Sequence, residues 1–172
     1  HVYVQKPLTR TIGEARRLTQ AAREKGVITQ MGNQGHSTDA TRVIKEWIDA
    51  GVIGEVREVH WWTDRPIWPQ GMADRPSPPA GNGAIPQELD WDLWLGSAPE
   101  RPYDPAYVPF NWRGWWDFGC GALGDMGCHI MDAAYYALNL GHPTMVDPIL
   151  TANSREAAHN ASVITYHFAA RG

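Results

Sequence analysis

The pattern of hydrophobic and polar positions at the start of the chain predicts a strand, a helix and a second strand. Residues 1–4 have the short apolar pattern of a strand. Thr11 and Glu14 fit a Thr-x-x-Glu capping box, and apolar positions then recur at helical spacing until Gly26. Residues 27–31 predict a short buried strand. This order of elements predicts a βαβ unit with two parallel strands.

A polar, glycine-rich segment follows the second predicted strand. Residues 32–36 read Gly-Asn-Gln-Gly-His, and they come just after the carboxyl end of a strand, where open α/β sheets bind ligands. Ser37 is positioned to cap a second helix, whose apolar residues recur at helical spacing until Gly51. Residues 55–62 alternate in polarity and predict a further strand.

The rest of the chain predicts a long loop, two helices and a final strand. Residues 64–86 are rich in Pro and Gly, and a loop of this length favours a binding role. Helices are predicted over 90–95 and from residue 121 or 122 to Leu140, and a strand over 162–168. Because the sequence begins and ends within strand-like segments, we expect it to be part of a longer polypeptide.

Composition restricts the class of protein. The chain has 172 residues, of which 43% are hydrophobic and 20% charged, as is typical of a globular protein. Its formal net charge of -4 argues against nucleic acid or an anionic membrane as a partner. Cys120 and Cys128 would lie about 12 Å apart on a helix, too far for a disulfide. The nine tryptophans leave two interpretations open, a Trp-rich core or a platform for a sugar or cofactor ring.

Residues 124–132 form the sharpest chemical motif. Asp125 and His129 are four residues apart and share a helix face, with Asp132 on the same side. A carboxylate beside an imidazole orients the ring and raises its basicity, as a general base requires. Two alternatives stay open: a capping Asp with a buried, hydrogen-bonded His, and a metal site that uses Asp125, Cys128 and His129. No further ligand follows at a recognised spacing, so we expect no metal.

A second motif has the form of a dinucleotide fingerprint. Residues 119–124 match Gly-x-Gly-x-x-Gly. The true fingerprint follows a hydrophobic strand that opens a βαβ unit, whereas residues 112–118 are loop-like. We therefore interpret this match as coincidental.

Five features in this order resemble the Gfo/Idh/MocA oxidoreductase family across nearly the whole chain. They are the opening His-Val-Tyr-Val-Gln-Lys-Pro-Leu, the helix end Ala-Arg-Glu-Lys-Gly, Met31-Gly-Asn-Gln, Gly51-Val-Ile-Gly-Glu-Val, and Gly-Asp125-x-Gly127-x-His129. The resemblance implies an α/β fold in which residues 1–32 end a Rossmann domain that binds NAD or NADP. It implies that residues 33–172 begin a substrate domain with a mostly antiparallel sheet. Both domains would be incomplete here, with the phosphate loop upstream.

The resemblance also assigns roles to residues. Lys6 matches the lysine of the family's Glu-Lys-Pro motif, near the nicotinamide and the substrate hydroxyl. His129 matches the acid/base of its Asp-x-Gly-x-His motif, with Asp125 orienting it. Gln5 stands where the family usually has a Glu that helps to hold the cofactor. The expected catalytic residues are Lys6, Asp125 and His129; the expected cofactor contacts are Gln5, Lys6, Asn33 and Gln34; the expected substrate contacts are His36, Trp112, Arg113, Trp116, Asp125 and His129.

Three functions are compatible with this sequence. The first is hydride transfer between a sugar or polyol hydroxyl and NAD or NADP, in which His129 takes the hydroxyl proton and Lys6 stabilises charge on the oxygen. The second is an NAD-dependent glycoside hydrolase of the same superfamily, which oxidises its sugar transiently. The third is a non-catalytic carbohydrate-binding domain. A homo-oligomer formed through the sheet of the substrate domain is expected, and the cellular compartment stays open.

Overall fold

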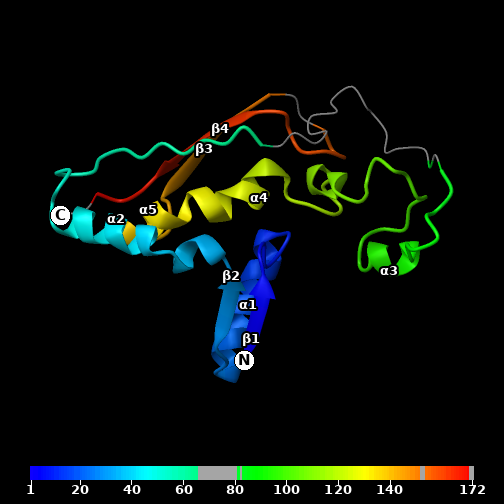
Figure 1. Cartoon of the computed structure of the whole chain (residues 1–172), viewed down its shortest axis with the longest axis horizontal. Coiled ribbons are helices and arrows are strands. Elements are labelled where there is room, and N and C mark those ends of the chain that lie inside the picture. Colours follow the sequence, from blue (N-terminus) through cyan, green and yellow to red (C-terminus); the bar gives the residue numbers. More distant parts are fainter. Residues whose placement is uncertain (66–80, 82, 152–153, 171–172) are drawn as a thin grey trace. The chain divides into compact units, whose positions relative to one another are not determined.

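The computed structural model describes residues 1–65, 81, 83–151 and 154–170 and has a mixed α/β fold (Figure 1). The element order is β1 (Val2–Gln5), α1 (Ile12–Lys25), β2 (Thr29–Gly32), the 3-10 helix η1 (Gln34–Ser37), α2 (Asp39–Asp49), α3 (Trp91–Leu95), the 3-10 helix η2 (Asn111–Gly114), α4 (Gly121–Ile130), α5 (Asp132–Ala137), β3 (Met145–Leu150) and β4 (Ser162–His167). Two compact units divide the chain, the first made of residues 1–63, 123–147 and 165–172, the second of residues 64–122 and 148–164. Most of the loop predicted over 64–86 lies outside the described residues.

The predicted βαβ unit is confirmed in the first unit. β1 and β2 pair in parallel, and the last residue of β1, Gln5, lies opposite the last residue of β2, Gly32. Both strands therefore end at the same edge of this small sheet. Lys6 and Asn33 are the next residues along the chain, so the register brings both of them to that edge.

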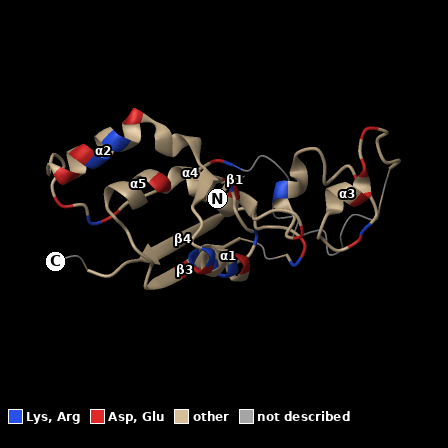
Figure 2. Cartoon of the chain, turned by 90° about the horizontal axis from the view of Figure 1, so that it is seen from below, with Lys and Arg blue, Asp and Glu red and all other residues tan. Residues whose placement is uncertain are grey.

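The connecting helix α1 has the caps that the sequence predicts. The Thr11 hydroxyl accepts a hydrogen bond from the Glu14 N–H, and the Glu14 carboxylate accepts one from the Thr11 N–H. Gly26 ends the helix with a left-handed φ of 58°. No α1 side chain is buried within the described structure, and mixed charges follow the helix (Figure 2). Ile12, on the predicted apolar face, is 76% exposed.

The second helix begins one residue later than predicted. Ser37 is the last residue of η1, and Thr38, with an extended ψ of 152°, precedes the first turn of α2. The Thr38 hydroxyl donates to the Gly35 carbonyl, which ties it back into the 3-10 turn. The prediction of Ser37 as the cap is therefore wrong, because residues 34–37 form a helical turn of their own. α2 ends at Asp49, just before the predicted stop at Gly51.

The strand predicted over residues 55–62 is wrong. No strand is assigned there, and neither sheet in the described part of the chain includes these residues. Glu55 and Arg57 are exposed and pair with each other at 3.0 Å. Alternating polarity favours a strand only where another strand supplies hydrogen-bond partners, and no strand among the described residues does so.

The long helix predicted up to Leu140 is divided into α4 and α5. Met131 separates them while keeping helical dihedrals, and its N–H donates to the Gly127 carbonyl. The second piece ends at Ala137, and Asn139 follows with a left-handed φ of 48°. Among the described residues, no helix is both long and apolar enough to cross a membrane.

β3 and β4 form a two-stranded antiparallel sheet. Backbone hydrogen bonds join Thr144 to His167 at one end and Thr151 to Ala161 at the other, which is the pattern of antiparallel strands. The predicted final strand is confirmed as β4. The sequence did not predict β3.

The second unit has an aromatic core. Trp115 is 1% exposed and Tyr107 is fully buried, and their rings meet edge to face at 5.1 Å. Trp91 completes the core, and its indole N–H donates to the Arg101 carbonyl. Core packing therefore accounts for Trp91 and Trp115, with Trp94 packed against them, whereas Trp62, in the first unit, is 82% exposed. Trp68 lies outside the described residues.

Candidate functional site

The candidate site lies in the first unit, where the carboxyl ends of β1 and β2 meet α4. Lys6 follows β1 and Asn33 follows β2. Helix α4 supplies Asp125 and His129, which the helical period places one turn apart, and also Cys128. The strand register and the helix period thus bring together residues that are far apart in the sequence.

A salt bridge joins Lys6 to Asp125. The Lys6 Nζ donates to Asp125 Oδ1 at 2.9 Å and to the Asp125 backbone oxygen at 2.7 Å. The two side chains are only 17% and 14% exposed. Hydrogen bonds between charged groups are the strong ones, particularly where water is excluded. The ammonium is therefore held at a fixed place beside the first half of α4.

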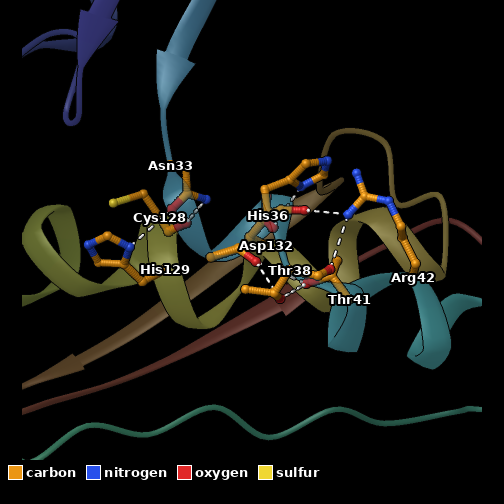
Figure 3. Close-up of polar contacts among 9 residues, drawn as sticks. Asn33, His36, Thr38, Thr41, Arg42, Cys128, His129 and Asp132 are labelled. Carbon is orange, nitrogen blue, oxygen red and sulfur yellow. Dashed lines mark hydrogen bonds and ion pairs between the residues drawn. The ribbon is translucent and has the colours of Figure 1, made fainter.

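Asn33 connects the end of β2 to the last turn of α4 (Figure 3). Its Nδ2 donates to the Cys128 carbonyl oxygen at 2.8 Å, and its Oδ1 lies 3.0 Å from Nδ1 of His129. Asn33 is 9% exposed. One buried amide therefore holds both the backbone and the imidazole of α4.

His36 belongs to a neighbouring cluster on α5 and α2. Its Nδ1 lies 2.8 Å from Asp132 Oδ2, and its ring meets Tyr136 edge to face at 5.1 Å. Arg42 donates to the backbone oxygens of His36 and Thr38 (Figure 3). The structure therefore gives Asp132, which the sequence placed beside His129, a contact with a different histidine.

Cys128 is held as a neutral thiol. Burial raises the pKa of the Cys128 thiol above its ordinary value. A protonated thiol is a poor metal ligand and a poor nucleophile. Within the residues that the structure describes, no group of three or more His, Cys, Asp and Glu side chains is arranged to hold a metal ion. Cys120 and Cys128, both among the described residues, are not joined by a disulfide, as their spacing predicted.

Three residues expected to contact substrate lie in the second unit. The Arg113 guanidinium stacks over the ring of Phe110 at 4.2 Å and over that of Trp112 at 4.4 Å. The Trp116 indole N–H donates to the Ser154 carbonyl at 3.2 Å. The roles of Trp112, Arg113 and Trp116 in substrate binding stay predictions.

The Gly-x-Gly-x-x-Gly match has a packing explanation. Residues 119–124 follow the 3-10 helix η2 and a turn, with no strand leading into them. A side chain at Gly119 would collide with the backbone of Arg113. This glycine is therefore required by the close approach of two backbone segments.

Sequence reasoning missed the contact between Asn33 and His129. The spacing of Asp125 and His129 predicts that Asp125 orients the imidazole, and this role stays a prediction. The structure adds Asn33 at the imidazole Nδ1 and Lys6 at the Asp125 carboxylate. Asn33 and His129 are 96 residues apart, and no local pattern reports a contact across that distance.

Two comparisons with known proteins identify the family. The family model described as "oxidoreductase family, C-terminal alpha/beta domain", of Gfo/Idh/MocA type, matches residues 76–170, more than half of the chain. The chain is also 24% identical over 151 residues to a levoglucosan dehydrogenase of Pseudarthrobacter phenanthrenivorans. That match covers 88% of this chain and 30% of the relative. The chain thus belongs to the Gfo/Idh/MocA oxidoreductase family.

Proposed function

We propose that the gene product containing this chain is an NAD(P)-dependent dehydrogenase that oxidises a secondary hydroxyl of a sugar or polyol. The observation that carries the proposal is that Lys6 and Asn33, at the carboxyl edge of two parallel strands, contact Asp125 and His129 of one helix. Ligands of open α/β sheets bind at such edges. The relative that is named a levoglucosan dehydrogenase supports a carbohydrate substrate.

His129 is the acid/base in this proposal. Oxidation of a carbinol breaks its C–H and O–H bonds and forms a carbonyl, so one group must accept the hydride and another the proton. When bound, NAD(P)⁺ accepts the hydride. The His129 imidazole takes the hydroxyl proton, and in the reverse direction it returns that proton to the carbonyl oxygen.

Lys6 and Asp125 provide the electrostatic part of the site. As the proton leaves, negative charge grows on the substrate oxygen, and a nearby ammonium stabilises it. Asp125 fixes that ammonium through two hydrogen bonds of 2.7 and 2.9 Å. A charge that is already in place needs no reorganisation during the reaction.

The donor set at the strand ends fits the nicotinamide end of the cofactor. Gln5, Lys6, Asn33 and Gln34 follow or end the two strands. Because the Asn33 amide contacts Cys128 and His129, the amides of Gln5 and Gln34 and the Lys6 ammonium are the groups that would contact the nicotinamide. The Gln5 amide lies so close to Gly32 that a side chain there would collide with it. Amides of this kind suit the carboxamide of nicotinamide, whereas no glycine-rich strand–turn–helix for a diphosphate occurs among the described residues. We therefore assign only the nicotinamide contacts to this chain.

The same observations support a domain organisation. Parallel strands are normally covered on both faces, yet β1 and α1 are exposed within the described chain. We propose that residues 1–32 are part of a larger Rossmann sheet and that residues 33–172 belong to the substrate domain.

Product analysis tests the proposed function. The full-length gene product is incubated with NAD⁺ or NADP⁺ and with levoglucosan, glucose or myo-inositol, and both the reduced nicotinamide and the sugar product are quantified. A dehydrogenase yields a ketosugar and reduced nicotinamide in equal amounts. Cleavage of an aryl glycoside without net reduced nicotinamide would instead identify a redox-neutral hydrolase. Sugar binding without any turnover would identify a binding domain.

Matched histidine variants locate the acid/base. His129→Asn should abolish turnover while leaving cofactor binding intact. His167→Asn is the control, because His167 lies on the exposed hairpin and pairs with Asp147 at 3.0 Å. Equal activity of the two variants would contradict the assignment.

A further inference from the structure

The Asn33 amide has one orientation that satisfies its neighbours. The Cys128 carbonyl oxygen can only accept a hydrogen bond, so the amide group 2.8 Å away must be the NH₂ donor. The opposite orientation would place two oxygens in contact. The amide oxygen therefore faces His129, 3.0 Å from its Nδ1.

This orientation determines which imidazole nitrogen carries the proton. An amide oxygen accepts hydrogen bonds and cannot donate them, so Nδ1 of His129 must be the donor. In a neutral imidazole one nitrogen is protonated and the other carries the lone pair, and the partner of one nitrogen sets the state of the other. A neutral His129 therefore carries its basic lone pair on Nε2.

The end of α4 leaves the Cys128 carbonyl available to a donor from outside the helix. Cys128 lies in the last turn of α4, where carbonyl groups lack partners within their own helix. Asn33 provides a donor for that carbonyl. Asn33 is only 9% exposed, so little water competes for its two hydrogen bonds.

We infer that Asn33 is a positioning residue that holds His129 as the Nδ1–H tautomer, so that Nε2 exchanges the substrate proton. This inference rests on the proposed role of His129 and extends it to a named nitrogen and a named partner. Losing the Asn33 amide oxygen, which accepts the hydrogen bond from His129 Nδ1, should lower kcat roughly ten- to a hundredfold, because a buried hydrogen-bonding group is left unsatisfied. KM should change little, because the amide is directed at protein groups.

The tautomer is measured directly by ¹⁵N–¹H correlation NMR of the full-length gene product labelled at histidine, with the His129 signal assigned by its loss in His129→Gln. We expect Nδ1–H in the wild type and a shift towards Nε2–H in Asn33→Ala. Asp147→Ala is the control, because it removes the partner of His167 and should leave the His129 signal and turnover unchanged. An Nε2–H tautomer in the wild type, or an unchanged one in Asn33→Ala, would overturn the inference.

Asn33→Asp provides a second variant in case the alanine variant does not fold. It keeps an acceptor for His129 and loses the donor to Cys128. The Nδ1–H tautomer should persist, and the carboxylate should raise the pKa of His129 relative to wild type, which moves the acid limb of the pH–rate profile to higher pH. An unmoved profile would show a merely structural role. Full turnover by His129→Asn would refute the proposed function instead, whatever the tautomer.

Discussion

Replacing Lys6 by Met should destabilise the protein much more than replacing a lysine in a surface ion pair. Lys6→Met keeps most of the apolar stem and removes the ammonium that Asp125 binds through two hydrogen bonds. Because both side chains are less than a fifth exposed, the Asp125 carboxylate would lose a partner that water replaces poorly. Hydrogen bonds of charged groups contribute about 1.5–3 kcal/mol. We therefore expect the free energy of unfolding to fall by about 2–3 kcal/mol.

Lys45 provides the matched control. It pairs with Asp49 at 2.8 Å, a distance comparable to that of the Lys6 pair, but the two side chains are 34% and 58% exposed. Exposed pairs four residues apart on a helix contribute about 0.3–0.5 kcal/mol. Lys45→Met should therefore cost no more than this, so the two variants compare a buried ion pair between distant segments with an exposed pair on one helix.

A double-mutant cycle isolates the interaction itself. The variants Lys6→Met, Asp125→Asn and their combination are unfolded with urea and followed by circular dichroism. The coupling energy should be about 1.5–3 kcal/mol, because the double variant has neither charge to leave unpaired. A coupling energy below about 0.5 kcal/mol, the size of a surface pair, would refute the reasoning.

Three further predictions concern other parts of the chain. Trp115→Ala should lower the free energy of unfolding by about 3–5 kcal/mol in urea titrations, whereas Trp62→Ala, at an 82% exposed position, should stay within about 0.5 kcal/mol; equal losses would contradict the core assignment. Hydrogen bonds from backbone N–H groups lower the pKa of Glu14, and the bond from the Thr11 N–H has the largest effect. The stabilisation that the ionised Glu14 carboxylate gives is therefore present at neutral pH and lost as pH falls through that lowered pKa. The melting temperatures of Glu14→Ala and wild type should converge in acid, and a difference that persists there would contradict this prediction. Because burial raises the pKa of Cys128, iodoacetamide should alkylate it slowly at neutral pH and faster in alkali, and rapid neutral labelling would exclude a buried thiol.

The elements set by local chemistry were predictable from the sequence. The capping box of Thr11 and Glu14 and the stop at Gly26 depend on residues within one helix, and the structure has all three. The strand–helix–strand order then determines that β1 and β2 are parallel. The prediction placed Lys6 and Asn33 after strands, and the register shows why both lie at the same edge of the sheet.

The elements that depend on distant partners were not predictable in the same way. Residues 55–62 have the polarity pattern of a strand but lack a neighbouring strand in the described structure. β3 contains Pro148, which weakens the strand pattern, yet it pairs with β4. The contact between Asn33 and His129 joins two segments 96 residues apart, and only the folded chain reveals it.

The central claim is that His129 exchanges the proton while a sugar or polyol carbon is oxidised. The most direct measurement is the single-turnover rate of nicotinamide reduction by the full-length gene product, compared between wild type and His129→Asn with cofactor and substrate saturating. A positioned general base contributes about 10²–10⁴-fold, so the variant should be slower by at least about a hundredfold with cofactor affinity unchanged. A variant that reduces nicotinamide at the wild-type rate would contradict the account.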